Sequence, residues 1–331
     1  MDNDNNNIFT LKDIFTVDFV KQVFRGSGQV MFQNNAITGL FFLAGIFWGS
    51  FESGNPNVAW GALIGLIVST LTGYIVGLPK SDGEIGLWGF NGILVGCGIF
   101  TFLGSTLFSW LALILCSAMS TWVRVGFNNL LAPYKINSLT FPFVFSTWIF
   151  LLASRAMEEL PVTHLATPLL PGFYDSNVHL GVENIIIYWL KGISQVFLID
   201  SWITGLIFLA GLFICNYRSA IWAMIASAIS LFIAIIFRAV GVDIESGLFG
   251  FSAVLTGIAL GSTFYISNNW KKTVWAIIGI IVTVFVQASM DILFEPFGLP
   301  TLTAPFCIAT WLFLLPLFKF ELKKKEHNNQ P

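Results

Sequence analysis

Four uncharged polar residues recur at matching positions in the two halves of this chain. Gln29 is matched by Gln195 and Thr140 by Thr303, in both cases about 163–166 residues further along. Amide and hydroxyl groups both donate and accept hydrogen bonds. Duplicated in this way, they are suited to contacting a small neutral solute.

Residues that could support catalysis or hold a metal ion lie elsewhere and lack a suitable spacing. His164 and His179 share a segment with Glu158, Glu159 and Asp175, but no H-E-x-x-H-like pattern is present. We interpret the segment as a solvated acidic loop and predict no catalytic residue, metal or cofactor. The four cysteines lie in apolar runs and are expected to be buried free thiols.

The composition is that of a membrane protein. Of 331 residues, 56% are hydrophobic and only 10% are charged, whereas about a quarter are charged in a typical soluble domain. The net charge of −2 offers no basic surplus for a phosphate backbone, so nucleic acid is not an expected partner. The first 35 or so residues lack the basic head and apolar run of a cleaved signal peptide, and we expect none.

Ten apolar stretches have lengths close to those of membrane-spanning helices. They lie at residues 36–51, 58–78, 86–104, 107–123, 140–156, 202–216, 219–241, 247–266, 273–288 and 303–320. Each set of five follows a shorter, more polar segment, 17–35 or 182–201. We predict that these two segments are half-membrane, re-entrant helices; surface amphipathic helices are the alternative.

These stretches divide the chain into five regions. They are a polar tail (1–16), a first repeat (17–156), an irregular connector on the outer side (157–181), a second repeat (182–320) and a basic cytoplasmic tail (321–331). With ten spans and a cytoplasmic N-terminus, thirteen of the sixteen Lys and Arg residues fall inside. This bias is the expected positive-inside pattern, and it places both termini in the cytoplasm.

The two halves are related in sequence. Residues 24–47 and 190–213 are identical at twelve of 24 aligned positions, and the GFNG and GFSA elements and the LTFPF and LTAPF elements follow in the same order. Because each half has an odd number of spans, the second must be inserted upside down. We therefore predict an all-α polytopic membrane protein of ten transmembrane helices plus two half-membrane helices, arranged as two inverted-topology five-helix repeats with the solute path between them.

The expected path is uncharged. No Asp, Glu, Lys, Arg or His falls at a span centre, although such residues mark ion-coupling sites and proton relays. Asp200, Arg155, Arg238 and Asp291 are expected at span edges, where snorkelling explains them. A narrow slot with apolar walls and polar edges would select a flat polar molecule and exclude hydrated ions.

At these residues the sequence resembles the urea transporter family. The motifs are GSGQVMFQNNAITGL with GISQVFLIDSWITGL, LWGFNGILVG with LFGFSAVLTG, and LTFPF with LTAPF, and the resemblance extends from Val23 to Leu317. It implies a homotrimer embedded in membrane lipid, in which each protomer has its own pore and urea permeates passively.

The resemblance also implies a set of pore residues. Gln29 and Gln195 would lie at slot edges, the aromatic side chains would form walls, apolar residues would narrow the path, and Thr140 and Thr303 would form the central constriction. The complete set is Gln29, Val30, Phe32, Phe90, Leu94, Thr140, Gln195, Val196, Leu198, Phe251, Leu255 and Thr303. Some relatives have Glu in place of Gln195, and several have Phe in place of Leu198, so the second slot is expected to be less symmetric.

The leading hypothesis is a passive urea channel of the plasma membrane, with a bacterial inner membrane as the expected location. The alternative within transport is a channel or carrier for another small neutral solute, such as a short amide, water or ammonia. A membrane-embedded enzyme would need a nucleophile, acid/base or metal constellation, and metal-dependent turnover of a substrate would be the evidence for it. A purely structural membrane protein would leave the duplicated Gln and Thr residues unexplained.

Overall fold

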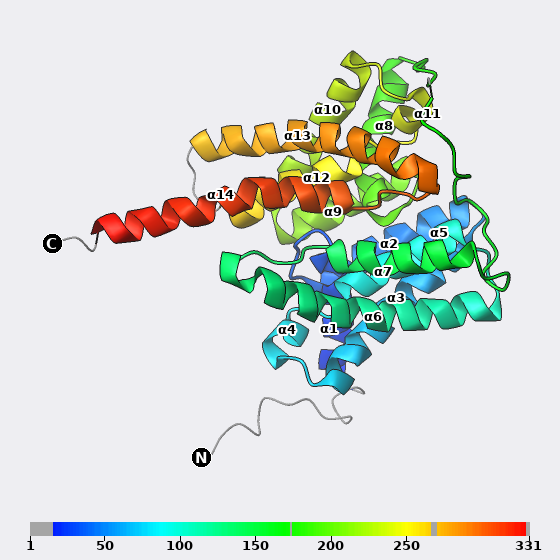
Figure 1. The fold of residues 1–331 in the computed structure, drawn as a ribbon, viewed down its shortest axis with the longest axis horizontal. Helices are drawn as coiled ribbons and strands as arrows, with labels where there is room; N and C mark the ends of the chain where they lie inside the picture. Colours follow the sequence, from blue (N-terminus) through cyan, green and yellow to red (C-terminus); the bar gives the residue numbers. More distant parts are fainter. Residues whose placement is uncertain (1–15, 173, 266–269, 329–331) are drawn as a thin grey trace.

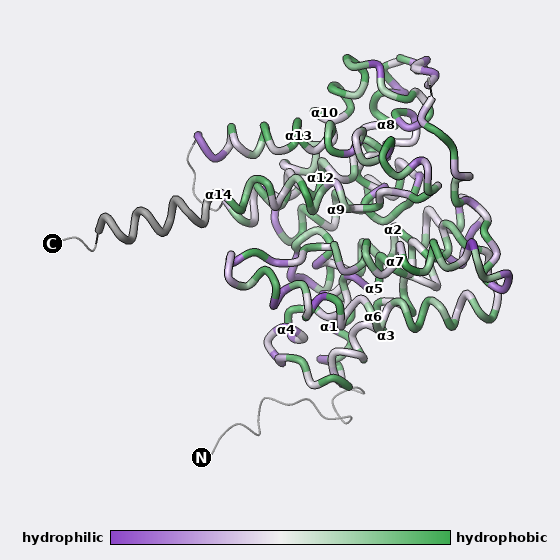
Figure 2. Tube along the Cα trace, in the orientation of Figure 1, coloured by the Kyte–Doolittle hydropathy of each residue, from purple (hydrophilic) through white to green (hydrophobic). Residues whose placement is uncertain are grey.

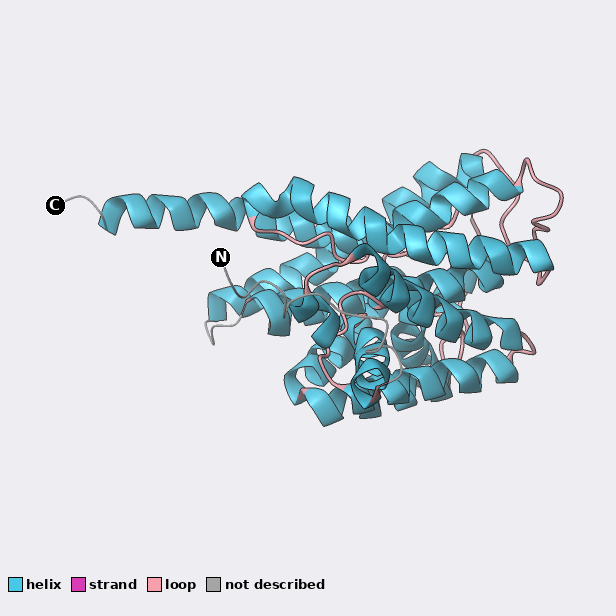
Figure 3. Ribbon diagram, turned by 90° about the horizontal axis from the view of Figure 1, so that it is seen from below, coloured by secondary structure: helices cyan, strands magenta, loops and turns pink. Residues whose placement is uncertain are grey.

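The computed structural model describes residues 16–172, 174–265 and 270–328, with side chains described as far as residue 316. The described residues form helices joined by turns, with one isolated β-bridge between Leu103 and Val162 and no strand (Figure 3). Residues 1–15 of the predicted polar tail and the side chains of the predicted basic tail lie outside this description. The backbone of the last helix continues to Asn328, beyond the predicted end of the second repeat at residue 320.

The helices of the first half run from residue 17 to residue 154. They are α1 (Val17–Gln29), α2 (Ala36–Glu52), α3 (Pro56–Val76), α4 (Lys80–Glu84), α5 (Phe90–Phe102), α6 (Leu107–Leu131), the 3-10 turn η3 (Ala132–Tyr134) and α7 (Phe141–Ser154).

The second half repeats this order. Its elements are α8 (Val182–Ser194), η4 (Gln195–Phe197), α9 (Trp202–Cys215), α10 (Tyr217–Ile236), α11 (Gly241–Glu245), α12 (Phe251–Ile258), the π-helical η5 (Ala259–Phe264), α13 (Trp270–Phe294), η6 (Glu295–Phe297) and α14 (Ala304–Asn328). The described residues of the connector, 157–181, contain no named helix.

The two halves occupy separate parts of the molecule. In Figure 1 the first half, coloured blue to green, lies below the second half, coloured yellow-green to red. The turn between α6 and α7 lies at the same end as the outer part of α14, and the connector lies at the opposite end (Figure 1). Hydrophilic residues gather toward these two ends, while hydrophobic residues follow the lengths of the helices between them (Figure 2).

Helix length supports a membrane-spanning protein. Among the described residues, α3, α6, α10 and α13 are long and apolar enough to cross a membrane, and α8 with η4 and α9 forms a pair bent by 71°. Five further apolar helices are shorter, at 10–17 residues: α2, α5, α7, the α12–η5 pair and the first part of α14. The chain is therefore a helical membrane protein with several apolar helices.

Local sequence signals explain where these helices begin. The Asn35 side chain accepts hydrogen bonds from the backbone N–H groups of Ile37 and Thr38 at the start of α2, and Ser201 accepts one from Thr204 at the start of α9. Such caps satisfy N–H groups that the first helical turn leaves without partners. The sequence therefore separates each short entry helix, α1 or α8, from the longer apolar helix that follows it.

Each entry helix packs closely against the next helix at a glycine. A Cβ at Gly39 of α2 would lie 1.7 Å from the backbone oxygen of Phe24 in α1, and one at Gly205 of α9 would lie 2.2 Å from that of Leu190 in α8. Only a residue without a side chain fits such an approach. The repeated ITGL sequence thus fixes how α1 and α8 are held.

Helices α2 and α9 meet across the boundary between the halves through reciprocal contacts. The Thr38 hydroxyl donates to the Gly211 carbonyl at 2.8 Å, and the Thr204 hydroxyl donates to the Gly45 carbonyl at 2.8 Å. Between them, the rings of Phe42 and Phe208 lie 5.2 Å apart.

Helices α7 and α14 are joined in the same reciprocal way. The Trp148 indole donates to the Pro300 carbonyl at 2.8 Å, and the Trp311 indole donates to the Asn137 carbonyl at 3.0 Å. In each pair, donor and acceptor exchange roles between equivalent positions of the two halves. Such exchange is the pattern expected across a two-fold axis.

The helices differ from the expected spans mainly at their ends. Helices α5 and α12 begin at Phe90 and Phe251, later than residues 86 and 247, because Gly86 and Gly247 turn the chain with φ of 83° and 73°. Helices α6 and α13 continue to residues 131 and 294, past the expected ends at 123 and 288. This extension matters for the site because it places Arg124 inside a helix.

Candidate functional site

Five of the predicted pore residues line one cavity. This cavity, of about 330 Å³, lies at the end of the molecule where α6 turns toward α7, and we call it the vestibule. Its lining includes Gln29, Val30, Phe32, Phe90 and Thr140. These residues come from α1, the turn after it, α5 and the start of α7, so the structure brings together side chains that are far apart in the sequence.

The two predicted glutamines make equivalent hydrogen bonds. Gln29 at the end of α1 donates from Nε2 to the Ile85 carbonyl at 2.7 Å, and Gln195 after α8 donates from Nε2 to the Ser246 carbonyl at 2.9 Å. Each acceptor precedes a glycine with positive φ. The two amides therefore occupy matching positions beside backbone oxygens, and Gln195 lies outside the lining of the vestibule.

Aromatic side chains form part of the lining of the vestibule. Phe32 adopts φ of 61°, and its ring lies 5.8 Å from Phe264 and 6.1 Å from Phe306, in both cases edge to face. Phe264 also lines the vestibule, and it is carried by the π-helical end of α12. The sequence analysis did not identify Phe264, because a π-helical turn has no clear sequence signal.

The threonines predicted for the centre of the path contact one another. The hydroxyl oxygens of Thr140 and Thr303 are 2.6 Å apart, and Thr140 also lies 3.4 Å from the Cys307 sulfur. Both threonines are buried, at 2% and 3% exposure. Each follows a leucine with positive φ, Leu139 or Leu302. The LTFPF and LTAPF elements thus form two matching turns that meet at the boundary between the halves.

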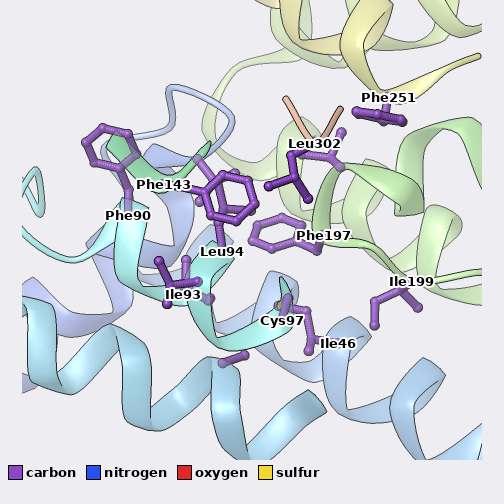
Figure 4. Close-up of a cluster of buried hydrophobic side chains, with 14 of the residues drawn as sticks. Ile46, Phe90, Ile93, Leu94, Cys97, Phe143, Phe197, Ile199, Phe251 and Leu302 are labelled. Atoms are coloured by element: carbon purple, nitrogen blue, oxygen red, sulfur yellow. The ribbon is translucent and has the colours of Figure 1, made fainter. Parts of the chain in front are cut away.

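The apolar residues that were predicted to narrow the path lie together in the core. Leu94, Leu255 and Val196 are buried in one core cluster with the rings of Phe90 and Phe251. Figure 4 shows Phe90 and Phe251 on opposite sides of the cluster. The labelled side chains that lie between them are Leu94, Phe143, Phe197 and Leu302 (Figure 4). Phe143, Phe197 and Leu302 were not among the predicted site residues.

Leu198 occupies the position equivalent to Phe32. Its φ of 60° matches the 61° of Phe32, so the backbone turn is kept although the side chain differs. Its Cδ1 lies 3.8 Å from the position that a Cβ on Gly98 would take. The half-buried leucine therefore packs near α5, where the other half has an aromatic ring.

Charged residues also line the vestibule, which the sequence analysis did not predict. Arg124, one of the thirteen Lys and Arg residues expected on the inner side, lies within α6 with only 6% of its surface exposed. Its Nη2 is 2.8 Å from Oδ2 of Asp82 on α4, and both residues line the vestibule. Arg124 lies within the helix because α6 continues about two turns beyond the predicted apolar stretch.

Two other charged residues near the helix ends have protein partners. Asp291 was expected at a span edge with snorkelling as the explanation, but its carboxylate accepts hydrogen bonds from Gln287 at 3.0 Å and from Thr301 at 2.8 Å. Arg155 donates to backbone oxygens of the connector and of Gly298. These bonds, rather than snorkelling alone, account for their positions.

Asp243 on α11 is the counterpart of Asp82 but has a different environment. Burial raises the pKa of its carboxyl from 3.8 to about 6, and the nearby charge of Asp291 adds to this effect. In the connector, the His179 backbone N–H donates to Glu245 Oε1 at 3.0 Å, and His179 Nδ1 lies 2.8 Å from the same oxygen; these two contacts lower the pKa of Glu245. No group of three or more potential metal ligands was found among the described residues.

Comparison with known proteins identifies relatives along nearly the whole chain. The family model "Urea transporter" matches residues 20–318. Urea transporter 1 of sheep (Ovis aries) and of goat (Capra hircus) are each 29% identical over 302 residues, which cover 90% of this chain and 77% of the relative. Urea transporter 1 of rat (Rattus norvegicus) is 29% identical over 304 residues with the same coverage.

Proposed function

Because the chain belongs to the urea transporter family, we propose that it is a passive urea channel whose path begins in the vestibule, passes Thr140 and Thr303, and leaves beside Gln195. The observation that carries this proposal is the contact between Thr140, which lines the vestibule, and Thr303 of the second half. Their hydroxyls give a buried, otherwise apolar centre one polar point. The protein is thus a transporter and not an enzyme.

The proposed mechanism follows from the chemistry of this lining. Urea is planar and neutral, so it can pass between aromatic faces while its N–H groups and its oxygen exchange hydrogen bonds with polar groups at the slot edges. Gln29 and Gln195 and their carbonyl partners supply such groups at the two ends. An ion would have to lose a hydration shell that this lining cannot replace, so the channel selects for neutral solutes.

The architecture that we propose is two inverted five-helix repeats, comprising ten membrane spans and the two half-membrane helices α1 and α8. The reciprocal hydrogen bonds of Thr38 and Thr204, and of Trp148 and Trp311, support a two-fold relation between the halves. The 71° bend between α8 and α9 supports a re-entrant α8. The proposed repeat boundaries remain 17–156 and 182–320.

Assembly and orientation are further parts of the proposal. We propose a homotrimer surrounded by lipid, as the family resemblance implies, with both termini in the cytoplasm as the distribution of Lys and Arg implies. The relatives named above are mammalian proteins. They carry no information on the expected bacterial inner membrane, which stays a prediction.

Urea flux into proteoliposomes tests the proposed function. Purified protein is reconstituted without an ion gradient, and stopped-flow light scattering is compared with that of empty liposomes. We expect urea flux well above lipid leak, unchanged when a proton or sodium gradient is imposed. Flux equal to lipid leak, or flux that requires a gradient, would contradict a passive urea channel.

The alternative permeants are another short amide, water and ammonia. The same vesicles distinguish them when acetamide, formamide, water and ammonia fluxes are compared with that of urea. Competition by urea analogues of similar size but altered hydrogen bonding then identifies the preferred solute. A path lined by paired amides and hydroxyls predicts that urea is preferred over analogues that lack an N–H group.

A further inference from the structure

The ion pair between Arg124 and Asp82 lines the vestibule. Arg124 is buried at 6% exposure, and its Nη2 lies 2.8 Å from Asp82 Oδ2. Both residues line the vestibule together with Gln29, Phe90 and Thr140. A buried arginine is costly unless it is paired, and here the pair lies at the entrance of the proposed solute path.

Neither member of this pair uses its full hydrogen-bonding capacity. A guanidinium carries five N–H donors and a carboxylate has two acceptor oxygens. Within residues 16–172, 174–265 and 270–328, one hydrogen bond is recorded for the Arg124 guanidinium, from Nη2 to Asp82 Oδ2. The pair therefore presents donors beside an acceptor at the cavity surface.

The equivalent position in the second half is different. Helices α6 and α13 have the same length of 25 residues and are followed by equivalent 3-10 turns, so Arg124 corresponds to Gln287. The Gln287 amide is fully engaged: its oxygen accepts from Ser252 at 2.8 Å, and its nitrogen lies 3.0 Å from Asp291 Oδ1 and 2.9 Å from the Thr301 hydroxyl. Of these two equivalent positions, the one at the vestibule carries a guanidinium with donors to spare.

We propose that Arg124 and Asp82 form a recognition site for a primary amide solute in the vestibule, ahead of the aromatic slot. This inference rests on the proposed path. An N–H of Arg124 donates to the carbonyl oxygen of the solute, while Asp82 accepts from its NH₂ group. A planar amide presents its acceptor next to its donor, which matches the order of groups that the ion pair presents.

Charge selects this class of ligand over ions. The positive charge of Arg124 is balanced by Asp82 at 2.8 Å, so an anion would meet the carboxylate and a cation would meet the guanidinium. A neutral molecule with both a donor and an acceptor avoids both repulsions while gaining charge-assisted hydrogen bonds. Urea, formamide and acetamide belong to this class.

A capture site ahead of the narrowest point should affect half-saturation rather than maximal flux. Its loss raises the concentration at which the path fills, but it leaves unchanged the barrier at Thr140 and Thr303. A structural role for the ion pair would have a different effect. In that case, loss of the ion pair would displace α4 and the Ile85 carbonyl that follows it, and would thereby lower flux at saturation.

The test compares concentration dependence in variants of the full-length protein. Arg124→Gln installs the residue found in α13, Arg124→Lys keeps the charge with a different donor geometry, and Arg155→Gln is the matched control outside the vestibule. Urea flux into proteoliposomes is measured by stopped-flow light scattering over a wide urea range. Thermal unfolding in detergent verifies that each variant is folded.

We expect Arg124→Gln to raise half-saturation at least about fivefold, with flux at saturation within twofold of wild type. The half-saturation of Arg124→Lys should lie between those of wild type and Arg124→Gln. The half-saturation of Arg155→Gln should match that of wild type within twofold. Unchanged half-saturation in folded Arg124→Gln, an equal shift in Arg155→Gln, or a loss of saturating flux alone would overturn the inference. If Arg124→Gln does not fold, an unshifted Arg124→Lys overturns it and a shift of twofold or more supports it.

The same data separate this inference from the proposed function. If wild-type urea flux exceeds lipid leak but half-saturation is unchanged in Arg124→Gln, the recognition site is refuted and the proposed channel is not. Wild-type flux no faster than lipid leak refutes the path, and the recognition site with it.

Discussion

The hydroxyl contact at the centre of the path is the residue-scale feature with the most direct consequence. Thr140→Val removes the partner that lies 2.6 Å from the Thr303 hydroxyl in a buried setting. A lost buried hydrogen bond and the unsatisfied group left behind cost roughly 1–3 kcal/mol. If that cost falls on the permeation barrier, urea flux should fall about fivefold or more in proteoliposomes.

Thr72→Val is the matched control for this prediction. The Thr72 hydroxyl donates to the Val68 carbonyl of its own helix, α3, and does not line the vestibule. The urea flux of Thr72→Val should remain within about twofold of wild type, because a threonine hydroxyl bond to a carbonyl of the same helix adds little to stability. Equal losses in the two variants would mean that Thr140 has a packing role only.

Asp243 gives the protein a pH-dependent stability. Burial, with the charge of Asp291 added, raises its pKa from 3.8 to about 6. The folded protein therefore keeps a proton that the unfolded chain releases near pH 3.8, so the contribution of this carboxyl to stability falls as pH rises from about 4 to about 6. Tm measured across this range in detergent should decline more steeply for wild type than for Asp243→Asn.

Other titrating groups near Asp243 set the limits of this comparison. Asp291 and Glu245 are present in both proteins, so the difference between the two Tm profiles reports the Asp243 carboxyl together with its charge interaction with Asp291. Parallel profiles from pH 4 to 6 would show that Asp243 titrates as an ordinary exposed carboxyl.

At the scale of elements, the docking of each entry helix depends on a single close approach. In Gly39→Ala the new Cβ would lie 1.7 Å from the Phe24 carbonyl, which α1 cannot accommodate without moving. Overpacking of this kind costs roughly 1–3 kcal/mol or more. We expect a lower Tm and a lower yield of folded protein, together with reduced urea flux because α1 carries Gln29.

Gly126→Ala is the control for backbone substitution. Gly126 lies within α6, and apart from the adjoining residues of its own helix no atom lies within 4 Å of the position that its Cβ would take. Alanine is the better helix former by roughly 0.5–1 kcal/mol, so Tm should stay the same or rise. A Tm for Gly39→Ala as high as that of Gly126→Ala would contradict the close packing of α1 on α2.

The elements were largely predictable, because a long apolar stretch has few alternatives to a helix in a membrane. Each of the ten predicted stretches overlaps a helix, and the glutamines and threonines were predicted as site residues because they recur. Partners across helices were not predictable. The pairing of Arg124 with Asp82 depends on how far α6 extends, and the place of Phe264 depends on a π-helical turn. Local sequence determines neither feature on its own.

At the scale of the whole molecule, the reciprocal contacts and the distribution of charge constrain different properties. Thr38 with Gly211 and Thr204 with Gly45 relate the two halves to each other without reference to the membrane. Orientation relative to the membrane depends instead on Lys and Arg. An even number of spans places both termini on the same side of the membrane, and the Lys and Arg bias makes that side the cytoplasm. The α6–α7 turn would then also lie in the cytoplasm, and the connector outside.

Cysteine labelling tests this orientation directly. Leu170 in the connector is 86% exposed, and Ala132 in the α6–α7 turn is also exposed. Three of the four native cysteines are buried, so replacing the fourth by Cys215→Ser gives a low background. We expect Leu170→Cys to react with a membrane-impermeant maleimide in intact cells, and Ala132→Cys to react only after the membrane is opened. The reverse labelling pattern would show that the protein has the opposite orientation, with the vestibule, Arg124 and Asp82 on the outer side.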